Sequence, residues 1–221
     1  MSFDSQVVSM IGTGFLETVL MVVFSSAISY AIGIPLGILL TVTDKGGIRP
    51  NRGLNLVAGT VINLLRSIPF IILLIAVLPF TRLVVGTTLG WKAVVVPLVI
   101  SAAPYVARMV ESSLKEVDAG VIEAAKSMGA DTRQIVWKVL LPESRPSLLL
   151  GAAISITTIL GYTAMAGFTG GGGLGTIAIN YGYYRYQTDI MLVTVVILIV
   201  IVQVIQEFFL RTARRTDKRI R

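Results

Sequence analysis

Two chemically versatile residue types are missing, because the 221-residue sequence contains no cysteine and no histidine. Disulfide bonds, thiol nucleophiles, imidazole bases and the common zinc sites are therefore excluded together, since each needs one of these side chains. The P-loop pattern GxxxxGK[ST] is also absent, so the chain cannot supply a P-loop ATPase of its own. We expect this chain to bind no cofactor and no metal.

Charged residues are scarce: they make up 14% of the sequence, against about 25% in a typical soluble domain. Hydrophobic residues reach 54%, and the mean hydropathy is +0.82. The apolar residues form long blocks that suit helices of roughly 20 residues crossing a membrane. We expect an all-α integral membrane protein with one transmembrane domain over residues 1–221 and no cleavable signal peptide. The five expected spans are residues 18–43, 54–80, 91–110, 146–168 and 190–210.

The basic residues are distributed unequally between the two sides of these spans. Most lysines and arginines lie in the loops after the first and third spans and in the tail 211–221, whereas the opposite side holds only Arg82, Lys92 and Arg185. Because basic loops stay in the cytoplasm, we expect the N-terminus outside and the C-terminus in the cytoplasm. The net charge of +7 then reflects topology, and no nucleic-acid partner is expected.

One cytoplasmic loop, about residues 115–143, has the pattern of folded structure. Residues 121–128 suit a short helix with Glu123 in its first turn, and Gly129 suits its end. Asp131 suits the N-cap of a second helix over 132–140, which Pro142 would end. Taken alone, this pattern also fits an amphipathic helix lying on lipid headgroups.

The residues of this loop resemble the EAA loop of the membrane subunits of ABC importers. That pattern reads E-A-A, three residues, G, nine residues, I, one residue, L-P. The matching positions here are Glu123, Ala124, Ala125, Gly129, Val139, Leu141 and Pro142. The only departure is Val139 in place of isoleucine. Residues 65–82, 104–114 and 161–175 further resemble the methionine-importer branch.

The resemblance implies a five-helix permease like those of type I ABC importers, in a bacterial inner membrane. The loop would form coupling helices that dock on a separate ATPase subunit, which binds the ATP. Two copies of the chain would form the pathway, two ATPase subunits would drive it, and an external substrate-binding protein, expected as a lipoprotein, would deliver the substrate. Methionine as the small-molecule substrate, in its L or D form, rests on the resemblance alone.

Three residues within the expected spans are candidates for the transport pathway. Arg66 is either a charge buried in the membrane or lies near the cytoplasmic surface, if the second span begins near Asn63. Pro69 is expected to kink this span and free backbone carbonyls. Met165 either packs between helices or acts as a flexible gate plug. Arg108 and Glu111 are expected to form a structural i,i+3 ion pair.

The glycine-rich segment 170–175 contains the spacing GxGxxG, which we do not interpret as a nucleotide site, because no strand precedes it and no helix clearly follows. We expect a flexible external loop that contacts a delivery protein. A stand-alone secondary transporter is the main alternative function, but Glu17 and the other candidate coupling carboxylates are expected at helix ends. A non-transporting scaffold and a permease for another solute are the remaining alternatives.

Overall fold

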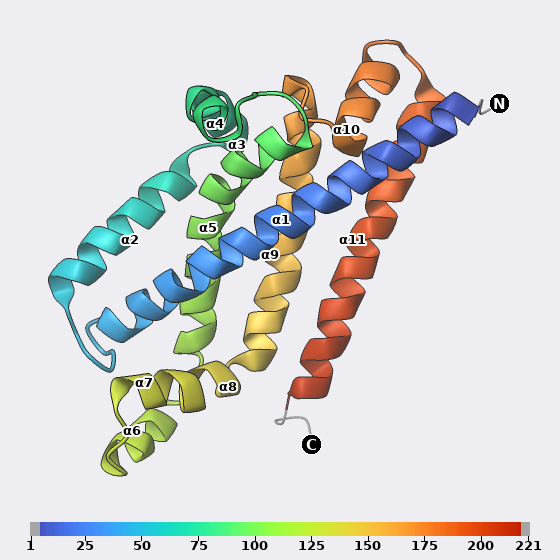
Figure 1. Cartoon of the computed structure of the whole chain (residues 1–221). Coiled ribbons are helices and arrows are strands. Elements are labelled where there is room, and N and C mark those ends of the chain that lie inside the picture. Colours follow the sequence, from blue (N-terminus) through green and yellow to red (C-terminus); the bar gives the residue numbers. More distant parts are fainter. Residues whose placement is uncertain (1–4, 218–221) are drawn as a thin grey trace. The chain divides into compact units, whose positions relative to one another are not determined.

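The structure, a computed structural model, describes residues 5–217, and all regular secondary structure in this range is helical (Figure 1). Contacts divide the chain into two compact units. Unit 1 comprises the residues up to 28 together with 68–102 and 156–205. Unit 2 comprises 29–67, 103–155 and the residues from 206 onward. Each unit therefore gathers segments that lie far apart in the sequence.

Among the residues that the structure describes, four helices are long and apolar enough to cross a membrane, and each contains a predicted span. They are α1 (Ser5–Thr43), α5 (Trp91–Lys115), α9 (Arg145–Met165, extended by the 3-10 helix η2, Ala166–Thr169) and α11 (Thr188–Thr216). The predicted bounds of the first, third and fifth spans were too short. Polar residues near their ends lower the local hydropathy but do not stop a helix, because the backbone N–H and C=O groups still pair within it. The hydroxyl of Thr13, for example, donates to Ser9 O of the preceding turn at 3.0 Å and stays within α1.

The second predicted span, residues 54–80, is not one helix. It is divided among α2 (Arg52–Ser67), α3 (Phe70–Ala76) and α4 (Leu78–Val85). Pro69 occupies the N-cap of α3, where its missing N–H leaves no hydrogen bond unmade. The predicted number of five spans holds if α2 and α3 together count as one interrupted span, and the number is four if they do not.

The core of unit 1 packs α3 and α5 against α1 and α9. Its buried members are Met21, Phe70, Leu74, Val94, Leu98, Ala102, Ile159 and Ala166. The Phe70 ring stacks on Tyr162 with a centroid separation of 4.4 Å. This stacking holds α3 in place immediately after the break at Pro69.

The glycine-rich segment of unit 1 is packed, so the prediction of a flexible loop without a following helix was wrong. Helix α10 (Gly173–Ile177) begins there and continues as the π-helix η3 (Ala178–Tyr183). Its first N–H groups are satisfied from α1: Gly173 N donates to Glu17 Oε2 at 2.7 Å, and Leu174 N donates to Thr18 Oγ1 at 2.9 Å. Figure 1 shows α10 beside the N-terminal half of α1.

In unit 2, α1 and α5 approach closely through a glycine pair. A Cβ atom on Gly33 would lie 2.6 Å from Val106 Cγ1, and one on Gly37 would lie 2.6 Å from Val110 Cβ. Both separations are shorter than carbon atoms tolerate, so only glycine fits at these two positions. Glycines four residues apart are a common way to bring two membrane helices into backbone contact. Close packing of α1 against α5 therefore holds these two helices together in unit 2.

Candidate functional site: the coupling segment

The coupling segment, defined here as residues 116–144, begins with α6 (Ala119–Ser127). Asp118 is its N-cap, with Oδ1 accepting from Gly120 N at 2.7 Å. The predicted helix over 121–128 is confirmed but starts two residues earlier, because this cap moves the first turn back. Glu123 is therefore the fifth residue of α6, not a first-turn residue, and its side chain is exposed.

Gly129 ends α6 as predicted. It adopts a φ of +79°, in the left-handed region that glycine enters without steric penalty. Gly129 N donates to Lys126 O at 2.9 Å, and Ala130 N donates to Ala125 O at 3.1 Å. This pair of bonds is a Schellman motif, which satisfies the last carbonyls of the helix and turns the chain sharply.

The second helix starts at a complete capping box. Asp131 Oδ1 accepts from Gln134 N at 2.7 Å, and Gln134 Oε1 accepts from Asp131 N at 3.1 Å. The prediction of Asp131 as the N-cap is therefore confirmed. Both turns of the coupling segment are fixed by bonds within a few residues, which is why they could be predicted from the sequence.

Pro142 does not end this second helix, contrary to the prediction. The helical path continues through α7 (Thr132–Ile135), the π-helix η1 (Val136–Leu140) and α8 (Leu141–Glu143). Pro142 lies in the first turn of α8, a position that tolerates its missing N–H. The wider π turn before it, closed by a bond from Leu141 N to Val136 O, accommodates the ring.

The coupling segment is attached to unit 2 by its own apolar core. Ala125 is 4% exposed, and Ile135 and Leu140 are each 1% exposed. They pack in one cluster with Val106, Val110, Leu114 and Val117 of α5 and its end. A displacement of α6 or α7 is therefore transmitted to α5 through close-packed side chains.

The two alanines of the motif have different surroundings. Ala125 is buried within the chain, whereas Ala124 is exposed beside Glu123. Ala125 is therefore covered by the chain itself, and its small side chain lets α6 lie against the core. Among the remaining motif positions, Val139, Leu141 and Pro142 are partly buried.

Large apolar side chains surround the exposed motif residues. Met128 is 82% exposed and Trp137 is 63% exposed, and Val121 on α6 is also exposed. Exposed Met and Trp within an otherwise charged segment are typical of a protein-binding surface. We call Val121, Glu123, Ala124, Met128 and Trp137 the docking face.

A ladder of charges runs along α5 behind the coupling segment. Glu111 Oε2 accepts from Arg108 Nη1 at 2.7 Å, confirming the predicted pair, and its Oε1 accepts from Lys115 Nζ at 2.9 Å. Arg108 Nη2 also donates to Asn63 Oδ1 of α2 at 2.9 Å. Lys115 Nζ lies 2.7 Å from Asp44 Oδ2, just beyond the end of α1. The ladder fastens α1 and α2 to the helix that carries the coupling segment.

The last member of this ladder has a shifted pKa. The hydrogen bond from Lys115 holds the pKa of the Asp44 carboxyl below its usual value, and a second bond from the backbone N–H of Lys45 adds to the effect. Both partners favour the charged carboxylate. Asp44 therefore stays ionised, and the tether stays intact, at neutral pH.

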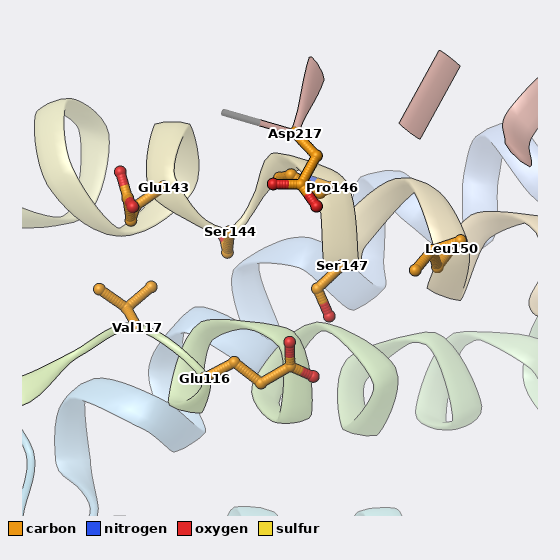
Figure 2. A pocket seen from close by; sticks show the side chains of 8 residues that line it. All are labelled: Glu116, Val117, Glu143, Ser144, Pro146, Ser147, Leu150 and Asp217. Carbon is orange, nitrogen blue, oxygen red and sulfur yellow. The ribbon is translucent and has the colours of Figure 1, made fainter. Parts of the chain in front are cut away.

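A small cavity of about 130 Å³ lies against the end of the coupling segment (Figure 2). Its walls include the carboxylates of Glu116, Glu143 and Asp217 and the hydroxyl of Ser147. Ser147 Oγ donates to Ser113 Oγ at 3.1 Å. Within residues 5–217, however, no group of three or more carboxylates is close enough together to hold a metal ion. We interpret the cavity as a packing gap beneath α8.

The candidate pathway residues lie near the interruptions of helices. Arg66 is exposed in the last turn of α2, 5.8 Å from the Tyr105 ring centroid. Helix α2 begins at Arg52 and ends at Ser67, so Arg66 does not lie inside a continuous helix over 54–80. The depth of Arg66 in the membrane stays a prediction. Pro69 follows at the start of α3, and Met165 is the last residue of α9, 47% exposed.

Comparison with known proteins decides the family. The model of the binding-protein-dependent transport system inner membrane component matches residues 33–221. The chain belongs to this family. It is therefore a multi-pass membrane component of a transport system and not an enzyme, as the coupling-loop motif predicted.

Individual members of the family are similar over most of their length. The Probable D-methionine transport system permease protein MetI of Vibrio cholerae is 50% identical over 203 residues, covering 92% of this chain and 90% of that protein. The methionine import system permease protein MetP of Bacillus subtilis is 49% identical over 168 residues, 76% of each chain. A solved inward-facing structure of the MetNI methionine ABC transporter contains a chain with 43% identity and a TM-score of 0.96, over 98% of this chain and 100% of that one.

Membership of this family excludes the stand-alone secondary transporter, although one argument used against that alternative was wrong. Glu17 does not lie at a helix end, because α1 is helical from Ser5 onward. Its carboxylate instead caps α10. No local pattern in the sequence indicates this role, since the two partners are 156 residues apart.

Proposed function

We infer that this chain is the membrane-spanning permease subunit of an ATP-driven, binding-protein-dependent importer of methionine in a bacterial inner membrane. The observation that carries the proposal is the likeness, over nearly the whole chain, to a chain of the MetNI methionine ABC transporter. The names of the Vibrio and Bacillus relatives support the same substrate. An importer for another small solute is the second candidate.

The docking face supports a coupling role for residues 116–144. A separate ATPase subunit binds the exposed Glu123, Ala124 and Met128, and the turn at Gly129 fits into its surface. Closure of two ATPase subunits on ATP then pushes α6 and α7. The buried cluster around Ala125 transmits this movement to α5, and the charge ladder transmits it to α1 and α2. The helices alternate between inward-open and outward-open states, which is a ligand-driven population shift.

The remaining partners follow from this mechanism. Two copies of the chain enclose the pathway, and an external binding protein, anchored as a lipoprotein, delivers methionine. The N-terminus lies outside and the coupling segment lies in the cytoplasm, as the distribution of lysine and arginine indicates. Arg66, Pro69 and Met165 lie along the pathway, and the half-exposed Met165 acts as the gate.

Reconstitution tests the proposal directly. The purified chain is assembled in liposomes with its ATPase and binding protein, and uptake of L- and D-methionine is measured against leucine and phenylalanine. We expect uptake of methionine that requires both ATP and the binding protein. Uptake of another solute without methionine would overturn the substrate and leave the permease assignment intact. ATP-independent uptake would overturn the permease mechanism itself.

A further inference from the structure

A basic cavity of about 360 Å³ lies between the end of α1 and the start of α2, and none of the docking face residues lines it. Its walls include Lys45, Arg52, Asn55 and Leu56. The volume falls within the range of small-molecule sites, about 300–1,000 Å³. Neither the coupling role nor the pathway uses these residues.

The two cations of this cavity are not neutralised by the protein. Within residues 5–217, neither Lys45 nor Arg52 has an ion pair with a carboxylate. Asp44 also lines the cavity, but one of its oxygens accepts from Lys115 Nζ and the other accepts from the backbone N–H of Lys45. Lys45 and Arg52 therefore give the cavity a positive charge that no carboxylate balances. This charge indicates a negatively charged ligand.

The wall of the cavity is fixed by hydrogen bonds. Asn55 Nδ2 donates to Leu40 O at 2.8 Å and to Thr43 Oγ1 at 3.1 Å. These bonds join the first turn of α2 to the last turn of α1. Arg52 is the first residue of α2, so the positive end of a 16-residue helix dipole faces the same region.

An apolar row continues from the cavity along α2. Leu56, which lines the cavity, is 66% exposed, and Val57, Val61 and Leu64 follow it with exposures above one half. An anionic group at the cavity with apolar chains along this row matches the two parts of a phospholipid. A basic pocket at the ends of membrane helices is a recurrent type of site for anionic headgroups.

We propose that the cavity between α1 and α2 binds the phosphate headgroup of an anionic phospholipid, held by Lys45 and Arg52. The acyl chains lie along the exposed row of α2. The bound lipid fixes the α1–α2 turn of unit 2 at the membrane surface. This lipid site is independent of the proposed transport function, because it does not depend on which solute the pathway carries.

Native mass spectrometry of the transporter in detergent tests the site. Dioleoyl phosphatidylglycerol and dioleoyl phosphatidylcholine, which share their acyl chains, are titrated separately into the wild type and the double variant K45Q/R52Q. We expect the wild type to prefer phosphatidylglycerol and the variant to bind it about 30-fold more weakly. The control R214Q/R215Q removes two exposed positive charges at the end of α11 instead, and it should bind like the wild type.

Three results of the lipid titrations would overturn the proposal: equal binding of both lipids by the wild type, unchanged binding by K45Q/R52Q, or an equal loss in R214Q/R215Q. Inorganic phosphate is a further probe, added to the transporter in a thermal unfolding assay. If phosphate raises the unfolding temperature as much as phosphatidylglycerol does, the ligand is not a lipid and the proposal is overturned. If K45Q/R52Q does not fold, the variant L56W, which fills the cavity and keeps both charges, replaces it. It too should lose selective binding of phosphatidylglycerol.

Discussion

The turn at Gly129 gives the sharpest test of the coupling segment, because two substitutions there share one backbone penalty and differ only in bulk. Gly129 has a φ of +79°, and a Cβ atom added to it would meet no atom within 4 Å. Any other residue therefore costs about 1–2 kcal/mol for the left-handed conformation, with no steric clash inside the chain. We expect G129A and G129W to destabilise the isolated permease by the same amount.

The two variants should differ in the assembled transporter. A tryptophan on this exposed turn adds a large ring where a docked ATPase would pack at the density of a protein interior. We expect G129W to reduce ATP-driven uptake and copurification of the ATPase at least about 10-fold, the effect of about 1.4 kcal/mol of lost binding. G129A should keep most of both activities. Membrane insertion, measured in the same cells, should be equal in the two variants.

Wild-type uptake by both G129A and G129W would refute this reasoning, because it would show that no partner covers the turn. Equal loss in both variants would also refute it, since the backbone penalty alone would then explain the effect. The unfolding midpoints of the two purified permeases separate these cases, because they report the chain without its ATPase.

Three further predictions concern the rest of the chain. T18V removes the acceptor of the fully buried Leu174 N–H, so it should lower the free energy of unfolding by about 1–3 kcal/mol. T18S keeps the hydroxyl and should not lower it, and equal thermal unfolding of the two variants would contradict the role of this cap. Asp44 has a lowered pKa, so its ion pair with Lys115 stabilises the fold above the usual carboxyl pKa and is lost as the pH falls through the lowered value. D44N should therefore cost about 1 kcal/mol or less at pH 7, and its stability should converge with that of the wild type in acid; a constant difference down to pH 2 would argue against the tether. M165A, at a half-exposed position, should leave stability unchanged and raise substrate-independent leak and ATPase activity in liposomes, and unchanged leak and ATPase activity would exclude the gate.

The sequence was sufficient wherever a feature depends on composition or on neighbours within a few residues. Scarce charge and long apolar blocks determine a membrane protein, because each span must satisfy its own backbone within the bilayer. The end of α6 and the start of α7 were predictable for the same local reason. Gly129 and the Asp131–Gln134 capping box close their hydrogen bonds within five residues of chain.

Only the tertiary structure decided which side chains face the core and which are exposed. Ala124 and Ala125 are identical in chemistry, yet Ala125 alone contacts the cluster of α5. Phe70, directly after the break at Pro69, stacks on Tyr162, 92 positions away in the sequence. Glu17 caps a helix across 156 residues. Such contacts depend on how distant segments pack together, and no periodicity or local motif within either segment encodes its partner.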